Sequence, residues 1–152
     1  MLLSTQDLGC DFFVFTGHKL YGPTGIGVLY GKYDVLESMP PYQGGGDMIE
    51  TVSFEKSTFK EPPYRFEAGT PPIAQVLGLG AAIDYVNGIG FDAIELHDRE
   101  MLRLLRNGMQ EIDGLNIYGD VSDKVGIISF TADWAHASDI GAILDQCGIA
   151  IR

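Results

Sequence analysis

The first forty residues alternate between short apolar runs and polar or glycine-rich breaks. Residues 10–15 form an aromatic and β-branched run that predicts a buried strand, and residues 25–30 predict a second strand. Residues 18–24 contain glycine and proline and are typical of a loop, so the two strands are expected to form an approximate hairpin. A short helix is expected over residues 32–39, because two prolines follow it directly.

Residues 40–72 show no clear periodicity, and we expect no regular structure in this segment. Three consecutive glycines, at positions 44 to 46, can adopt backbone angles that are closed to other residues. A loop of this length is usually functional or covered by a partner. The segment also carries apolar side chains, which predicts a contact surface between subunits. These side chains are Met48, Ile49, Val52 and Phe54.

Helical periodicity dominates the second half of the chain. Leu79, Ala82, Ile83 and Val86 recur at helical spacing, and a longer helix is predicted from about residue 92 to residue 112. Strands are predicted over residues 115–118 and 125–131. They are followed by a helix that Ser138 caps and Gly148 ends, and residues 149–152 begin another strand.

The order of these elements indicates an α/β or α+β fold. The turn-rich stretch at residues 62–72 is the expected boundary, which divides the chain into residues 1–72 and residues 73–152. The chain stops as a strand begins, and its opening strand has no elements before it. We therefore expect the chain to be a piece of a larger protein.

Composition and charge narrow the function classes. Of the 152 residues, 45% are hydrophobic and 20% charged, which is typical of a globular protein. The net charge of -11 argues against a nucleic-acid binder, and it disfavours binding to an anionic membrane surface. No apolar run approaches the length of a membrane span. Cys10 and Cys147 lie far apart, which fits the reducing cytoplasm, and His97 and His136 lack metal-ligand spacing, so no metal is expected.

Lys19 is the sharpest candidate for chemistry. It follows a predicted buried strand, in a glycine-rich loop beside His18 and Thr16. A lysine held in such a place can lose solvation and act as a Schiff-base amine. The competing interpretation, which composition alone favours, is a surface lysine in a turn, because most lysines are exposed.

The order of residues around Lys19 changes this weighting. Several blocks, in order along the chain, resemble class V, fold-type I enzymes that use pyridoxal phosphate, and most closely the Suf-type cysteine desulfurases, also called selenocysteine lyases. The blocks are FTGHKLYGPTGIG at 15–27, GGGDMI at 44–49, RFEAGTP at 65–71, GLGAA at 78–82, DIG at 139–141 and GIAIR at 148–152. The resemblance implies that the first half is the end of the large cofactor domain, with a mainly parallel sheet, and that the second half is a small α/β domain.

The resemblance also assigns roles to residues. Lys19 matches the catalytic lysine that binds pyridoxal phosphate covalently and then moves protons, and His18 and Thr16 match residues of the cofactor pocket. Thr70 matches a residue that reaches the cofactor phosphate of the partner subunit in a homodimer. Arg152 matches an arginine that holds the substrate carboxylate, a task that suits its fork of donors. From the residues alone, each could instead be structural: a loop-capping histidine, a Thr-Pro turn or a surface arginine.

The resemblance places other functional groups outside this chain. The nucleophilic cysteine of such desulfurases lies beyond the arginine that matches Arg152, and the ring-stacking histidine and pyridine-nitrogen aspartate lie before the matching segment. Cys10 and Cys147 match no nucleophile, and we expect both thiols to be buried. We therefore expect this chain to be inactive alone.

The implied function is the removal of sulfur from L-cysteine, or of selenium from selenocysteine. It leaves alanine and an enzyme persulfide, which passes to an acceptor protein for iron–sulfur cluster assembly in the cytoplasm. The alternatives are another class V enzyme, such as a selenocysteine or cysteine-sulfinate lyase or an aminotransferase, and a non-catalytic structural fragment.

Overall fold

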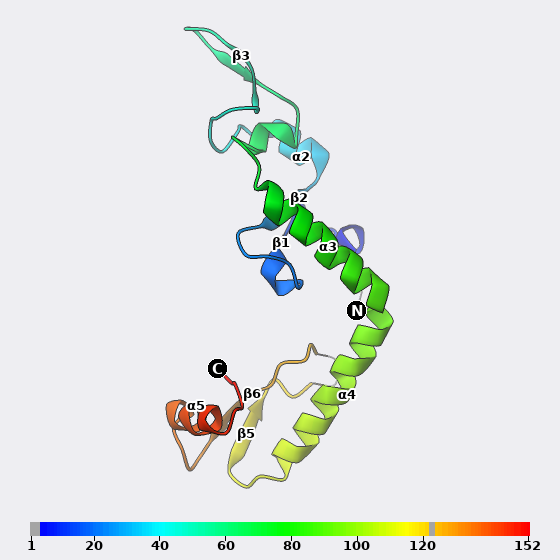
Figure 1. The fold of residues 1–152 in the computed structure, drawn as a ribbon, viewed down its shortest axis with the longest axis vertical. Coiled ribbons are helices and arrows are strands. Elements are labelled where there is room, and N and C mark those ends of the chain that lie inside the picture. The colour runs from blue at the N-terminus through cyan, green and yellow to red at the C-terminus, as the bar shows by residue number, and fades with distance from the viewer. Residues whose placement is uncertain (1–3, 122–123) are drawn as a thin grey trace. The chain divides into compact units, whose positions relative to one another are not determined.

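The computed structural model describes residues 4–121 and 124–152, and its contacts divide the chain into two compact units between Gly90 and Phe91 (Figure 1). This division lies later than the boundary expected at residues 62–72. The first long helix therefore groups with the strands that precede it. In the described residues the strands form three two-stranded sheets, all antiparallel, so the parallel sheet implied for the large domain is not formed by these strands.

The first unit opens with the predicted hairpin. After the short helix α1 (Thr5–Leu8), strand β1 (Phe12–Thr16) pairs with β2 (Gly27–Gly31) in an antiparallel register that sets Thr16 opposite Gly27. Helix α2 (Tyr33–Ser38) follows β2 directly, as predicted. The prediction succeeds here because aromatic and β-branched runs, glycine breaks and the two prolines all give the same result.

The expectation of no regular structure over residues 40–72 was wrong. Strands β3 (Ile49–Val52) and β4 (Ser57–Phe59) form an antiparallel hairpin, and a 3-10 turn η2 (Tyr64–Phe66) follows. The hairpin turn is closed by Ser53, whose backbone N–H donates to the Lys56 carbonyl at 2.9 Å while its hydroxyl accepts from the Glu55 and Lys56 N–H groups. Strands of four and three residues are too short to give a clear period-two pattern.

Helix α3 (Ile73–Ile89) completes the first unit and supplies most of its core. Leu79, Ala82 and Val86 are buried, on the spacing that the sequence predicted, whereas Ile83 is exposed. The helix packs against the loop between β1 and β2. A Cβ added to Gly78 would lie 3.0 Å from the Pro23 ring. Met48, just before β3, is fully buried.

The second unit begins with α4 (Phe91–Gln110), close to the predicted helix, and continues with the antiparallel strands β5 (Leu115–Tyr118) and β6 (Ser129–Ala132). Strand β6 starts later than the predicted strand at residues 125–131. Met109 is the buried residue of α4. Arg106 on α4 forms a bidentate ion pair with Asp120, the Nη2 to Oδ2 distance being 2.8 Å.

Helix α5 (Ala137–Gln146) has a different N-cap from the one predicted. His136 is the cap, because its Nδ1 accepts from the backbone N–H of Ser138 at 3.3 Å, so Ser138 lies inside the helix. Gly148 ends the helix as predicted, with φ 77. The strand expected at residues 149–152 is absent, because the Ile149 N–H turns back to the Leu144 carbonyl at 2.8 Å and completes a Schellman motif.

Within the described residues, no helix is both long enough and apolar enough to cross a membrane.

The Arg106–Asp120 pair makes the stability of the chain depend on pH. The hydrogen bond from Arg106, more than its charge, lowers the pKa of the Asp120 carboxyl below the ordinary value. Stabilisation by a lowered carboxyl pKa is present above the unfolded-state pKa of about 4 and is lost as pH falls through the folded-state pKa. We therefore expect Asp120→Asn to lower the free energy of unfolding at pH 7, and the difference from wild type to shrink toward zero below about pH 4.

Urea denaturation across this pH range measures the effect. Asp113→Asn serves as the control, since the exposed Asp113 carboxylate makes no hydrogen bond or ion pair within the part of the chain described. A difference between Asp120→Asn and wild type that is the same at pH 3 and pH 7 would contradict the assignment.

Candidate functional site

The turn between β1 and β2 is closed by backbone hydrogen bonds that converge on one glycine. The Gly17 N–H donates to the Ile26 carbonyl at 2.9 Å, and the Gly17 carbonyl accepts from the N–H groups of Leu20 and Gly22, each at 2.9 Å. A Cβ at position 17 would lie 2.7 Å from Ile26 Cγ2 and 3.2 Å from the Pro23 carbonyl oxygen, so a side chain there would require Ile26 or the turn to move. Within this turn, residues Gly17–Lys19 form the 3-10 helix η1.

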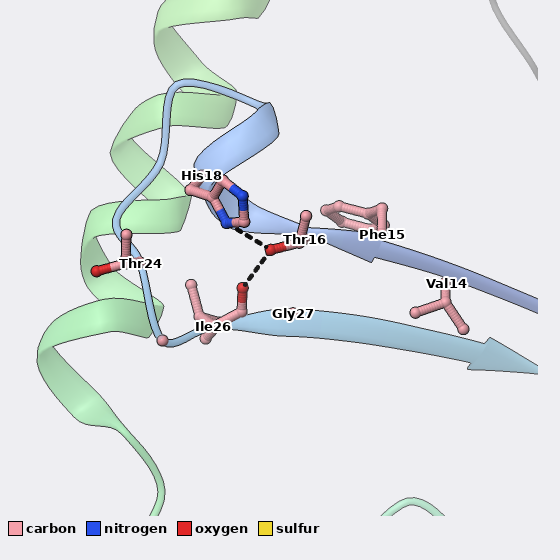
Figure 2. Close-up of a pocket in the computed structure, with 8 residues that line it drawn as sticks. Val14, Phe15, Thr16, His18, Thr24, Ile26 and Gly27 are labelled. Atoms are coloured by element: carbon pink, nitrogen blue, oxygen red, sulfur yellow. Dashed lines mark hydrogen bonds between the residues drawn. The ribbon is translucent and has the colours of Figure 1, made fainter. Parts of the chain in front are cut away.

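Thr16 and His18 meet at the start of this turn. Thr16 Oγ1 lies 2.9 Å from His18 Nδ1 and 3.4 Å from the Ile26 carbonyl oxygen (Figure 2). A threonine hydroxyl has a single proton. Both contacts therefore form at once when His18 Nδ1–H donates to Thr16 Oγ1 and the hydroxyl donates to Ile26. The hydrogen bond holds the imidazole ring beside the end of β1, and Nε2 is the ring nitrogen not engaged with Thr16.

An open hollow lies where Thr16 and His18 face β2 (Figure 2). Its polar groups come from the end of β1, from η1 and from the loop before β2, and its apolar wall comes from Val14 and Phe15 of β1 and from Ile26 just before β2. The lining residues are Val14, Phe15, Thr16, His18, Thr24, Gly25, Ile26 and Gly27. A hydroxyl and an imidazole at an open apolar-walled hollow can bind an anionic oxygen, such as that of a phosphate.

Lys19 is the last residue of η1 and is exposed. It directly follows His18 but is not among the residues that line the hollow. The loop that it starts is held from behind by α3, since Leu79 Cδ1 would lie 3.2 Å from a Cβ at Gly22. Tyr21, which has a left-handed φ of 57, makes an edge-on ring contact with Tyr85, and the two ring centroids lie 6.1 Å apart. The turn that carries Lys19 is therefore held by the Gly17 hydrogen bonds that close it and, on its outer side, by contacts with α3.

The structure brings Thr16, His18 and Lys19 together in one turn, and neither Thr70 nor Arg152 is part of this turn. Thr70 is exposed in the segment before α3, and the hydrogen bonds of the described residues do not join it to Thr16 or His18. Arg152 is exposed and belongs to the second unit. Sequence reasoning missed Thr24 and Ile26 as lining residues, although both lie within the GPTGIG stretch that closes the loop.

The two cysteines differ from expectation. Cys10 is half-buried, with its thiol 4.0 Å from the Thr5 carbonyl oxygen, and Cys147 is exposed rather than buried. The interpretation of Cys147 as a core thiol was wrong because the only buried residue of α5 is Ile140, and Cys147 lies at the C-cap, past the helix's last turn.

Comparison with known proteins identifies the family of this chain. The family model for class V aminotransferases matches residues 1–152. A cysteine desulfurase from Dickeya dadantii is 50% identical over 151 residues, which are 99% of this chain and 36% of the relative. The chain therefore spans little more than a third of the length of this relative.

Solved structures show the same fold at similar coverage. The cysteine desulfurase CsdA from Escherichia coli superposes with a TM-score of 0.90 at 39% identity, over 97% of this chain and 36% of that one. The cystine C–S lyase C-DES, in complex with its product cysteine persulfide, superposes with a TM-score of 0.83 at 28% identity, over 99% of this chain and 40% of that one. A variant of C-DES carries glycine covalently linked to its PLP cofactor.

The glycine-closed turn with its Thr16–His18 pair thus lies in a chain matched along its whole length by one family model. The chain belongs to the class V aminotransferase family, and its fold is that of the cysteine desulfurases to which it is similar.

Proposed function

We propose that this chain supplies the cofactor lysine of a cysteine desulfurase that uses pyridoxal phosphate. The observation that carries the proposal is the position of Lys19, which directly follows the Thr16–His18 pair in a turn that closes tightly around Gly17. The similarity to cysteine desulfurases along nearly the whole chain supports it. The covalent cofactor of the C-DES variant supports the choice of pyridoxal phosphate.

The residues present fit this cofactor. Its phosphate accepts hydrogen bonds, and the Thr16 hydroxyl at the open hollow would donate to it in place of the Ile26 carbonyl, which this hydroxyl contacts at the long distance of 3.4 Å. Its aldehyde needs an amine, and the Lys19 side chain leaves the same turn. Pyridoxal phosphate, when bound, supplies the electron sink that makes bonds at the amino-acid α-carbon labile.

The proposed roles of the residues follow. The Lys19 amine holds the cofactor and then moves a proton at the α-carbon of the substrate. Thr16 and His18 hold the phosphate in place, and Thr70 reaches the phosphate in the partner subunit of a homodimer. Arg152 binds the substrate carboxylate with its two-pronged guanidinium group.

The proposed reaction takes the sulfur of L-cysteine onto a cysteine thiolate as a persulfide and leaves alanine. Neither Cys10 nor Cys147 is assigned as that thiolate. The persulfide would pass to an acceptor protein of iron–sulfur cluster assembly in the cytoplasm. The similarity to a cystine C–S lyase favours lyase chemistry as the second candidate. Product analysis separates the two, because the desulfurase forms alanine in equal amount to persulfide.

A direct test of the proposed function concerns Lys19. In the full-length protein, borohydride reduction followed by peptide mapping should place the cofactor on Lys19. Lys19→Ala should lose this adduct and lower alanine formation by about 10²- to 10⁴-fold, because the proton transfer at the α-carbon loses its base. Lys32→Ala is the control, since Lys32 pairs with Asp11 at 2.7 Å, a contact outside the Lys19 turn. Cofactor found on Lys32, Lys56 or Lys60 instead would refute the assignment.

A separate prediction concerns the homodimer. The tip of the β3–β4 hairpin presents Phe54, which is fully exposed, and Val52 is also largely exposed. Apolar side chains in this position are typical of a subunit contact. We expect the full-length protein to be a two-fold dimer, and Phe54→Glu to weaken it by about tenfold or more while Phe54→Tyr preserves it. Sedimentation velocity measures the dissociation constant, and a fully active monomer would rule out this role.

A further inference from the structure

The C-terminal end of helix α2 cannot satisfy its own carbonyl groups. The last four carbonyls of a helix have no partner within the helix. Here Ser38 Oγ donates to the Val35 carbonyl at 2.7 Å, and the Met39 N–H donates to the Leu36 carbonyl at 3.2 Å. The next two residues are prolines, which have no N–H to offer. The following chain therefore has no backbone donor for the Glu37 carbonyl.

Arg65 supplies the missing donors from a distant part of the sequence. Its Nη1 donates to the Glu37 carbonyl at 2.9 Å and to the Met39 carbonyl at 3.4 Å. Its Nε donates to the Lys60 carbonyl at 2.9 Å. One half-buried guanidinium thus joins the end of α2 to the segment that leaves β4.

The segment that Arg65 holds is hydrogen-bonded to the glycine triplet at positions 44 to 46 and continues to Thr70. The Lys60 N–H donates to the Met48 carbonyl at 3.0 Å, and the Gly69 N–H donates to the Gly46 carbonyl at 2.9 Å. These two bonds lie on either side of Arg65 and fix residues 60–69 against residues 46–48. The Met48 side chain, next to the first of these bonds, is fully buried. Thr70 is the next residue after the second bond.

At its other end, α2 is attached to the hairpin that carries Lys19. Only Lys32 separates α2 from β2, and β2 pairs with β1, whose end holds the Thr16–His18 pair. The contact is close, because a Cβ at Gly31 would lie 2.8 Å from Leu36 Cγ. Figure 1 shows the turn that follows β4 beside α2. The Arg65 guanidinium therefore connects α2, and through it the hairpin that carries Lys19, to the segment that ends at Thr70.

We propose that Arg65 is a positioning residue that fixes the Gly46 and Thr70 segments relative to the hairpin that carries Lys19. The inference rests on the proposed function for its catalytic consequence, because it makes the presentation of Thr70 to a cofactor phosphate depend on Arg65. The clamp needs arginine in particular. The planar guanidinium of arginine reaches three carbonyls from two different nitrogen atoms held in a fixed geometry, whereas a lysine ammonium donates from one nitrogen atom only.

The experiment compares Arg65→Met, Arg65→Lys and wild type in the full-length protein. Hydrogen–deuterium exchange should be about tenfold or more faster in Arg65→Met for peptides spanning residues 60–70, because the Lys60 and Gly69 amides, which donate to the Met48 and Gly46 carbonyls, lose their support. Exchange in residues 12–31 should match wild type. Pyridoxal phosphate, added to the apoprotein, should bind about tenfold more weakly to Arg65→Met, with an intermediate value for Arg65→Lys. Arg103→Met, an exposed arginine of α4, is the matched control.

The two readouts separate failure of the inference from failure of the proposed function. Exchange of residues 60–70 at the wild-type rate in Arg65→Met would overturn the clamp, whether or not the protein binds pyridoxal phosphate. Faster exchange with wild-type cofactor affinity would overturn the positioning role while the function stands. If wild type itself takes up no cofactor at Lys19, the proposed function fails and the exchange contrast still decides the clamp. Should Arg65→Met not fold, Arg65→Lys carries the same comparison.

Discussion

The site depends on the close approach of Gly17 to the strand that returns from it. The amide and carbonyl of this glycine make three of the hydrogen bonds that close the β1–β2 turn, and the space where a side chain would stand is taken by Ile26 and Pro23. Because the turn closes so tightly, Thr16 and His18 are brought within hydrogen-bond distance, and Lys19 leaves at a defined place. An amine that reacts with a cofactor bound nearby needs such a fixed origin, since catalysis depends on position to within a fraction of an ångström.

The rest of the first unit supports this turn from two directions. Helix α3 covers the outer side of the loop through Leu79 and Tyr85, which ties the helix to the placement of Lys19. Helix α2 continues from β2 and, through Arg65, reaches the segment that ends at Thr70. Residues far apart in the sequence are thereby held in one unit although few of its side chains are fully buried. Hydrogen bonds to backbone carbonyls replace part of the packing that a larger core would supply.

The sequence predicted the elements whose signals were strong and agreed with one another. The β1–β2 hairpin and helices α2, α3 and α4 follow from apolar runs, prolines and helical periodicity. The β3–β4 hairpin was missed because its strands are very short and because a serine side chain, rather than an Asn-Gly pair, closes its turn. The α5 cap was misplaced because histidine is an uncommon N-cap, so that Ser138 was the better statistical candidate.

The chemistry at the site was predictable in part. Motif resemblance selected Thr16, His18 and Lys19, and the structure shows that the first two are bonded to each other and that the third lies in the same turn. Nothing in the sequence pattern indicated that Arg65 caps α2. Arg65 lies 28 positions after Glu37 and 26 after Met39, and it binds their backbone carbonyls, which are groups that every residue carries. The roles of Thr70 and Arg152 stay predictions.

Cofactor binding by Gly17→Ala in the full-length protein tests the central claim most directly. The added methyl group must push Ile26 or the turn aside, a change that costs about 1–3 kcal/mol in a tightly packed place. The account predicts that pyridoxal phosphate binds at least about tenfold more weakly, with loss of its visible absorbance band, while Gly80→Ala, where no atom lies within 4 Å of the new Cβ, binds as wild type. Wild-type affinity and spectrum in a folded Gly17→Ala protein would contradict the account.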